Sequence, residues 1–294
     1  MNGAYARPMN RGPTSLLLLT LLLTLPVPVA LSAPADSVSS ARALQDRYDL
    51  AGVSAGGRNW SSSELQQLAS SLASLDGKER KAIRGVQFVR GTAPRQPRES
   101  GLFEWDRQGR RITIYDGAFR EQGAGPNWTV VHEVGHAIAA WPLVQAQKRE
   151  RRALAKYNDA IATYNAQVGA YNKAAQRFNR TQKESDRRAA DAARAKLDKA
   201  QTSASGLRGP ALSAKRRTRK AQRALKTRRP RSGVLADYRS VLGRGPAPTR
   251  YGSTHIRESF AEAMAMYRCD PARLKKQLPR VHEWFTRGGH LTEL

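Results

Sequence analysis

Residues 130–138 read VVHEVGHAI, a His-Glu-x-x-His motif set between apolar residues. Residues four positions apart in a helix lie on one face, so the imidazoles of His132 and His136 point to one place. Two neutral imidazoles at this spacing suit Zn2+, which takes nitrogen ligands at about 2.0–2.1 Å. Glu133 lies about 100° round the helix, where its carboxylate can reach a water molecule beside the ion. The stretch therefore predicts a short helix that carries a zinc site and a general base.

A buried helix with two structural histidines is the alternative explanation for this motif. The chain has only 5 His in 294 residues, so a chance occurrence of the spacing is rare. The apolar neighbours would pack the helix into a protein body, and Gly135 would permit a close approach of another segment beside the metal. A Lewis acid, a water of lowered pKa and a general base in one helical turn favour a hydrolase.

A catalytic zinc usually has three protein ligands and an open position, so the motif needs a partner elsewhere. The residues after His136 lack the Gly and His of the metzincins. The first carboxylates that follow the motif are Glu150 and Asp159, and both fall in a basic helical segment. We expect neither of them to be a ligand.

A stronger candidate lies far downstream, in residues 251–267, which read YGSTHIRESFAEAMAMY. Glu258 and Glu262 are four residues apart there and share one face of a predicted helix. Two carboxylates that face an apolar body are costly unless they are engaged. A metal would engage Glu258 as a ligand, and an imidazole N–H would engage Glu262 in the surroundings of the site. An exposed acidic edge that pairs with nearby arginines is the alternative.

The two motifs together resemble the catalytic domain of anthrax toxin lethal factor and the related Pro-Pro endopeptidases, which are gluzincin metalloproteases. The resemblance rests on HEVGH at 132–136, YGST at 251–254 and ESFAEA at 258–263. It implies that His132, His136 and Glu258 bind Zn2+ and that Glu133 is the general base. It also implies that Tyr251 donates to the oxyanion of the tetrahedral intermediate, a role that suits a phenol.

The resemblance covers the metal helix and residues 251 to about 285, and not the N-terminal third. His255 stands where the family does not keep a histidine, and an extra ligand is one interpretation of it. The substrate pocket cannot be identified from the sequence, so the Pro-Pro preference of the relatives does not carry over.

The N-terminus has the pattern of a secretory signal peptide. Arg7 and Arg11 precede an apolar run at 16–25, and an A-x-A site ends at Ala35. The run is shorter than the roughly 20 residues that span a bilayer. We expect residues 1–35 to be removed and the protein to be secreted or to stay in the periplasm or cell envelope; an uncleaved anchor is the alternative. Cys269 is the single cysteine, so an internal disulfide is excluded. Its place at the expected end of a helix predicts that Cys269 is a small buried residue.

Residues 36–130 predict a small body of helices and strands. A helix should start at the serines after Trp60, with a leucine stripe from Leu65 to Leu75. The alternating residues 86–90 predict a strand, and residues 103–115 predict a β-hairpin.

Residues 145–231 are an insertion relative to the resembled family. Tyr-Asn or Phe-Asn pairs recur every seven residues over 157–179, with one apolar residue between successive pairs, which predicts a coiled coil. We expect residues 203–210 to turn the chain and residues 211–229 to return. About 54 residues would then run outward and about 19 would return. This mismatch predicts that residues 154–178 pack on the catalytic body or on a second copy of the chain.

The insertion carries most of the net charge of +27. It holds 25 Lys and Arg against 6 Asp and Glu. Such an arm suits anionic envelope polymers, anionic lipid head groups or acidic proteins, whereas export argues against nucleic acid. A solvated coiled coil that its charge keeps soluble is the alternative.

The expected architecture is an α+β, zincin-like metalloprotease domain in two pieces, 36–144 and 232–294, interrupted by a basic helical hairpin at 145–231. The expected activity is zinc-dependent hydrolysis of a peptide or protein substrate. Two other functions remain open. One is an inactive envelope-binding protein with a structural metal site, and the other is a metallohydrolase of a non-peptide envelope polymer.

Overall fold

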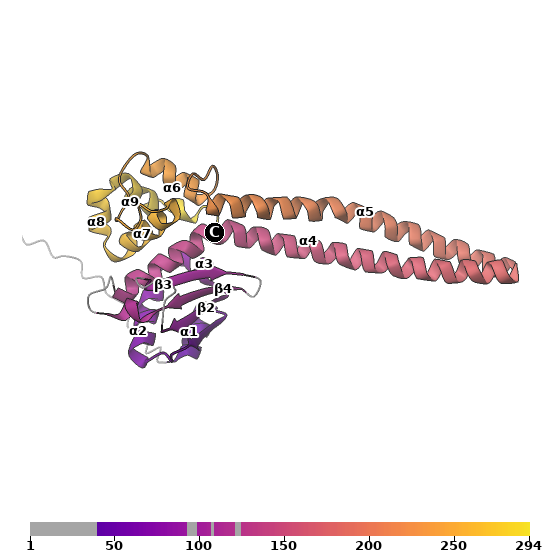
Figure 1. The fold of residues 1–294 in the computed structure, drawn as a ribbon, viewed down its shortest axis with the longest axis horizontal. Helices are drawn as coiled ribbons and strands as arrows, with labels where there is room; N and C mark the ends of the chain where they lie inside the picture. The colour runs from indigo at the N-terminus through magenta and orange to yellow at the C-terminus, as the bar shows by residue number, and fades with distance from the viewer. Residues whose placement is uncertain (1–39, 93–98, 107–108, 121–124) are drawn as a thin grey trace, which may run out of the picture. The chain divides into compact units, whose positions relative to one another are not determined.

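The computed structural model describes residues 40–92, 99–106, 109–120 and 125–294 (Figure 1). The predicted signal peptide, residues 1–35, lies outside this range. Residues Asp36–Leu294 form one compact unit, and everything below concerns that unit. Within the described residues, no helix combines the length and the apolar character that crossing a membrane requires.

A four-stranded mixed sheet forms the N-terminal part. Its order is β1-β2-β4-β3, with β1 and β4 parallel to β2 and with β3 antiparallel to β4. The predicted strand at 86–90 and the predicted hairpin are confirmed, whereas β1 and its parallel pairing were not predicted. In chain order the elements are α1 (Ala41–Tyr48), β1 (Gly52–Gly56), α2 (Ser62–Ala73), α3 (Glu79–Ile83), β2 (Val86–Gly91), β3 (Gly101–Trp105), β4 (Arg110–Ile114) and the 3-10 helix η1 (Asp116–Phe119).

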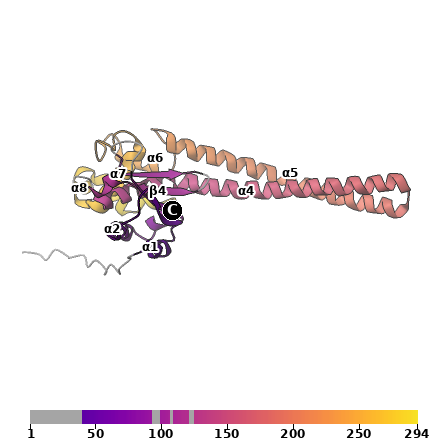
Figure 2. The ribbon, with the colours of Figure 1, turned by 60° about the horizontal axis from the view of Figure 1, so that its bottom comes forward.

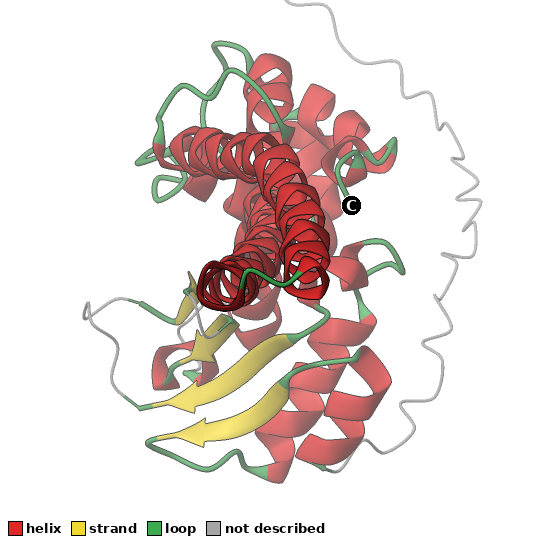
Figure 3. Ribbon diagram, turned by 90° about the vertical axis from the view of Figure 1, so that its right-hand side faces the viewer, coloured by secondary structure: helices red, strands yellow, loops and turns green. Residues whose placement is uncertain are grey.

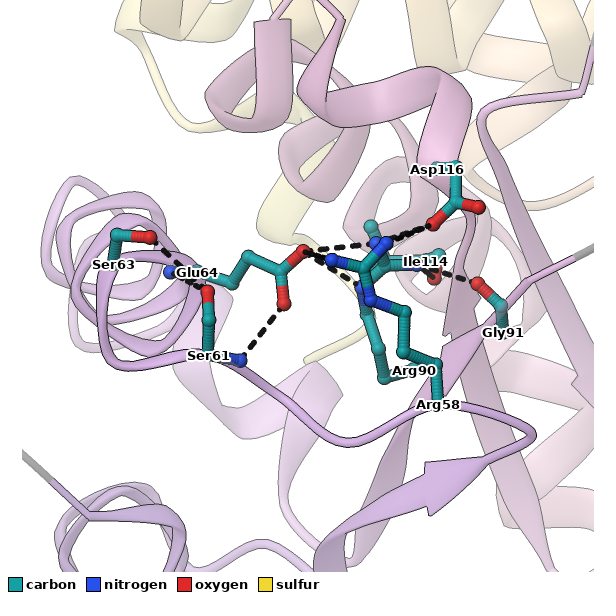
Figure 4. A network of polar contacts seen from close by, with 8 residues as sticks. All are labelled: Arg58, Ser61, Ser63, Glu64, Arg90, Gly91, Ile114 and Asp116. Atoms are coloured by element: carbon teal, nitrogen blue, oxygen red, sulfur yellow. Dashed lines mark hydrogen bonds and ion pairs between the residues drawn. The ribbon is translucent and has the colours of Figure 1, made fainter.

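A network around Glu64 joins α2 to the sheet (Figure 4). Ser61 caps α2 in a reciprocal capping box, in which the Glu64 carboxylate accepts from the Ser61 amide. The same carboxylate lies 2.8 Å from the guanidinium of Arg90, which is 1 % exposed and also pairs with Asp116. Burial raises the pKa of Glu64, but the hydrogen bonds from Arg90 and Ser61 outweigh it and lower the pKa. The predicted helix start and leucine stripe are confirmed, because Leu65, Leu68, Leu72 and Leu75 are buried.

The histidine motif lies in α4, which runs from Gly125 to Thr181 as one helix of 57 residues. The prediction of a short helix was therefore wrong. Pro142 lies inside α4, and the helix continues past it into the insertion. The N-terminal part of α4 is buried against α2, β3 and α7, while the remainder forms one arm of the hairpin (Figures 1 and 2). The metal motif and the arm thus share one continuous backbone.

The chain reverses at residues 182–183, so the prediction of a turn at 203–210 was wrong. Gln182 has a left-handed φ of 53°, and Lys183 precedes α5 (Glu184–Lys226). The buried Asp186 holds this turn, since its carboxylate accepts from Thr181 and lies 2.9 Å from the Arg177 guanidinium. No glycine or proline marks the position, and this is why the sequence pattern did not indicate it.

Residues 203–210 stay helical because an alanine stripe continues through them. The buried alanines of α5 recur at helical spacing and face α4: Ala190, Ala200, Ala204, Ala211 and Ala214. A Cβ atom on Gly206 or Gly209 would meet nothing within 4 Å, so close packing does not require glycine at either position. The two arms lie side by side over most of their length (Figures 1 and 2). The two arms are therefore not mismatched in length, and the argument for self-association through residues 154–178 that rested on such a mismatch no longer applies. Self-association itself stays an untested prediction.

The C-terminal helices pack on the N-terminal part of α4. They are α6 (Val234–Leu242), α7 (Ile256–Cys269), α8 (Pro271–Gln277), α9 (Pro279–Thr286) and the 3-10 helix η2 (Gly289–Leu291). An aromatic cluster of Tyr238, Phe260 and Phe285 fills the space between α6, α7 and α9. Cys269 is exposed at the end of α7, so the prediction of a buried cysteine was wrong. The whole is an α+β fold with a long helical hairpin (Figure 3).

Candidate metal centre

The close approach of α4 and α7 brings the two sequence motifs together. A Cβ atom on Gly135 would lie 2.9 Å from the Cα atom of Ala261, so only glycine permits this helix spacing. The carboxylate Oε2 of Glu258 lies 3.1 Å from Nε2 of His136 and 3.5 Å from Nε2 of His132. All three side chains are buried. The expected juxtaposition across about 120 residues is present.

The geometry of these three residues fits a tetrahedral metal ion. Their potential ligand atoms all lie within 4.8 Å of one another. Ligands about 2.0–2.1 Å from a tetrahedral ion would be roughly 3.3 Å apart. This value falls between the 3.1 Å and 3.5 Å separations of the two histidines from Glu258. Oε2 of Glu258 is buried and has no hydrogen-bond partner, although Arg257 lies 3.4 Å from the other oxygen. An oxygen left in this state is a position that a cation would satisfy.

The surroundings of His132 favour positive charge. Burial alone would lower its pKa, but the carboxylates of Glu258 and Glu262 beside its two ring nitrogens raise the pKa to about 10. The same contacts with the histidines lower the pKa of Glu258, against the opposing effect of burial. Three carboxylates, those of Glu133, Glu258 and Glu262, meet here in buried surroundings. A divalent cation held by His132, His136 and Glu258 would balance that charge.

Glu133 lies beside the three candidate ligands but is not one of them. Its side chain is 4 % exposed, and its Oε2 atom has no hydrogen-bond partner. Burial raises the pKa of Glu133, although the nearby histidines and a backbone hydrogen bond from Phe103 oppose the shift. Gly101 in β3 makes room for the carboxylate, because a Cβ atom there would lie 2.8 Å from its Oε1. Glu133 is therefore a buried carboxylate with one oxygen free to accept a proton.

Glu262 holds the ring of His132 from behind. Its Oε1 lies 3.0 Å from Nδ1 of His132, which leaves Nε2 facing Glu258. Burial would raise the pKa of Glu262, but the contact with His132 lowers it, and hydrogen bonds from Thr249 and Trp128 act in the same direction. Such contacts fix the tautomer and the orientation of an imidazole ligand. Sequence reasoning missed Thr249 and Trp128, which no motif singles out.

Tyr251 closes one side of the site. Its ring centroid lies 6.0 Å from that of His132, yet the side chain is 56 % exposed. Partial burial, together with the negative charge of Glu258 and Glu133, raises the pKa of Tyr251, so the phenol keeps its proton. Gly252 lets the loop approach α7, since a Cβ atom there would lie 3.2 Å from the Cα atom of Ser259. Tyr251 is thus a protonated donor at the edge of the site.

A cavity of about 570 Å³ opens beside these residues. His132, Glu133 and Tyr251 form part of its wall, and Arg273 of α8 contributes a cation. The remaining lining residues are Glu99, Ser100, Gly101, Trp128, Thr129, Thr249 and Glu262. A cavity of this volume can hold several side chains of a bound peptide.

His255 has a structural role instead of that of a fourth ligand. It is the N-cap of α7, and its Nδ1 accepts from the amide of Arg257 at 3.1 Å. A second hydrogen bond joins its ring to the backbone of Lys226, the last residue of α5. His255 therefore connects the end of the hairpin to the start of the helix that carries Glu258.

Comparison with known protein families, with characterised proteins and with experimentally determined structures gives no match.

Proposed function

We propose that this chain is an exported, zinc-dependent endopeptidase. The observation that carries the proposal is the buried Oε2 of Glu258, which has no hydrogen-bond partner and faces Nε2 of His136 at 3.1 Å and Nε2 of His132 at 3.5 Å. Beside it, Glu133 offers a buried carboxylate oxygen that is also without a partner. A structural metal site needs neither this extra carboxylate nor a phenol at its edge, so both favour a catalytic site.

Each residue has one task in the proposed reaction. His132, His136 and Glu258 would hold Zn2+, which would supply Lewis-acid chemistry to the water and to the scissile carbonyl. Glu133 accepts the proton of the attacking water and passes it to the departing amine. Tyr251 donates its hydroxyl hydrogen to the oxyanion that develops on the carbonyl. Glu262 keeps the ring of His132 in place throughout. This division of tasks resembles that of the gluzincin metalloproteases. The proposal therefore includes a zincin-like fold for the catalytic part of the chain.

The test is cleavage of a peptide library by the zinc-loaded chain and by Glu133→Gln. We expect the variant to keep its zinc, because Glu133 is not a ligand, and to lose about 10²–10⁴-fold in kcat/KM, the usual contribution of a general base. Zinc content and cleavage are measured on the same sample. An unchanged rate in Glu133→Gln, or cleavage that survives removal of zinc, would refute the proposal.

Tyr251→Phe tests the oxyanion donor separately. The substitution removes one hydroxyl, and we expect kcat to fall by about 10²–10³-fold with zinc retained. Tyr171→Phe is the matched control, since Tyr171 lies on the hairpin arm of α4, away from the cavity. Equal rates for the two variants would assign Tyr251 no part in the chemistry.

A further inference from the structure

The positive charge of the hairpin is concentrated at its base, where the two arms join the rest of the unit. Residues 148–156 and 215–231 hold 15 Lys and Arg and 1 Glu. The middle of the hairpin, 157–172 and 189–214, holds only 4 Lys and Arg and 3 Asp and Glu. The tip, 173–188, holds 6 Lys and Arg and 2 Asp and Glu, so the net charge is +14 at the base and +4 at the tip. A charge that served only solubility would have no reason to be so unevenly distributed.

The cations at the base are exposed and have no acidic partner within the described part of the chain. All 15 are exposed, and none of them forms an ion pair there. By contrast, Arg177, Arg187 and Arg188 near the tip do pair with acidic residues. Unpaired cations at this density create a local positive potential that attracts anions.

A cavity of about 230 Å³ lies among these charges, between the two arms. Its floor is apolar, formed by small side chains such as Ala139 and Ala146 of α4 and by Leu225 of α5. Arg217 and Lys220 stand at its α5 side, and Glu293, whose pKa is raised by burial, also lines it. The site therefore combines room for an apolar side chain with two cations beside it.

This base is connected to the metal centre through both arms. Ala139 follows His136 by three residues, which is about 4.5 Å along the helix axis. His132, Ala139 and Ala146 recur every seven residues, so they lie on nearly the same face of α4. From the other arm, Lys226 is hydrogen-bonded to His255, three residues before Glu258. A peptide bound in the cavity at the hairpin base would therefore lie within one turn of α4 from the His-Glu-x-x-His motif.

We propose that the hairpin base is a docking site for an acidic segment of the polypeptide substrate, with one apolar residue among its carboxylates entering the cavity of about 230 Å³. The segment would lie beside the scissile bond in the substrate sequence, and the inference rests on the proposed peptidase function. An apolar cavity among the cations favours a polypeptide over nucleic acid. The concentration of charge at the base, instead of at the tip, favours it over a lipid surface.

The test is binding of a fluorescent Asp/Glu-rich peptide with a central Leu, measured by anisotropy on the full chain. Arg217→Gln/Lys220→Gln/Arg223→Gln removes three exposed charges at the base, and we expect about tenfold weaker binding. Lys173→Gln/Arg180→Gln/Lys183→Gln removes the same charge near the tip and should change affinity less than about twofold. Equal losses in the two variants would overturn the proposal, because they would reflect net charge alone.

A second variant tests the cavity without changing charge. Ala224 lines the cavity, and Ala224→Phe should fill it. We expect this variant to weaken binding of the Leu-containing peptide and to leave binding of an all-acidic peptide unchanged. Tighter binding of duplex DNA or of phosphatidylglycerol vesicles than of the peptide would also overturn the proposal. Binding is read without cleavage, so an inactive chain that still binds the peptide refutes the peptidase alone, and an active chain that does not bind it refutes the docking site alone.

Discussion

Two groups of histidine and carboxylate side chains in this molecule look alike by distance and differ in what balances them. His132, His136 and Glu258 form one group, and Asp76, Glu79 and His290 form the other; in each, the potential ligand atoms lie within 4.8 Å of one another. In the second group a side chain of the protein, Arg268, supplies the positive charge. The Arg268 guanidinium lies 2.7 Å from Glu79 and 3.2 Å from Asp76, and Nε2 of His290 lies 2.8 Å from Glu79.

Among the described residues, no arginine or lysine pairs with the Oε2 atom of Glu258 in the first group in this way. Arg257 reaches only Oε1 of Glu258, and Oε2 keeps no hydrogen-bond partner. The comparison teaches that a cluster of ligand-type residues does not define a metal site by itself. The identity of the positive charge that balances the buried carboxylates decides between a site for an ion and a structural ion pair.

The largest effect should come from removing a ligand in the first group. We expect Glu258→Gln to abolish tight zinc binding and peptide cleavage together. Zinc at about 1,000 times its Kd should stabilise the unsubstituted chain by about 4 kcal/mol, and this gain should disappear in the variant. Zinc titration and thermal unfolding with and without a chelator measure both effects.

His290→Gln is the matched control for that experiment. It replaces a histidine of the second group, where Arg268 already supplies the charge. We expect zinc stoichiometry and affinity to stay as in the unsubstituted chain. If His290→Gln loses zinc as Glu258→Gln does, the distinction between the two groups fails.

The second prediction removes the internal cation from the other group. Arg268→Met removes the guanidinium from the carboxylate of Glu79, which is 0 % exposed and keeps, among the described residues, only its contacts with His290 and the Asp76 amide. We expect the free energy of unfolding to fall by about 3–5 kcal/mol, the usual cost of breaking a buried pair from one side. Because the remaining ligand atoms are still close together, added Zn2+ should restore part of this loss.

Arg280→Met tests whether that loss is specific. Arg280 is an exposed arginine of α9, and it forms no ion pair with any described residue. Its replacement should change stability by less than about 0.5 kcal/mol. Urea unfolding compares the two variants, and similar losses would show that Arg268 does not act as the charge balance of Glu79.

The residues of the first group could be predicted because their spacing carries their geometry. Four-residue separations place His132 over His136 and Glu258 over Glu262 on helix faces. The resemblance to the gluzincin metalloproteases was needed to link the two pairs, because an exposed acidic edge explained Glu258 and Glu262 as well. Their assembly in the structure required one further condition, a small residue where α4 and α7 meet. The position of Gly135 within the motif already indicated such a residue. The start of α2 at the serines after Trp60 could be predicted for the same reason, since a serine cap is local.

The second group could not be predicted, since its partners lie far apart along the chain. Glu79 and Arg268 are separated by 189 residues, and neither belongs to a spacing pattern. The turn at Gln182 was missed for a different reason: Asp186 holds it through side-chain contacts, whereas Gly206, Gly209 and Pro210 suggested a turn elsewhere. Local turn signals did not prevail over the continuous alanine stripe of α5, because packing along the whole arm outweighs the cost of residues that are poor in helices.

The smallest of the expected effects tests how the first group is assembled. Gly135→Ala would place a Cβ atom 2.9 Å from the Cα atom of Ala261, so α4 and α7 must separate. We expect about 1–3 kcal/mol of lost stability from overpacking, together with weaker zinc binding as Glu258 moves away from the two histidines. Gly169→Ala, also in α4, meets nothing within 4 Å and should stabilise the helix by about 0.5–1 kcal/mol. Urea unfolding and zinc titration of both variants measure the difference. The opposing atom at Gly135 belongs to the backbone, so no change of rotamer can relieve the contact, and equal behaviour of the two variants would mean that the spacing of these helices does not assemble the site.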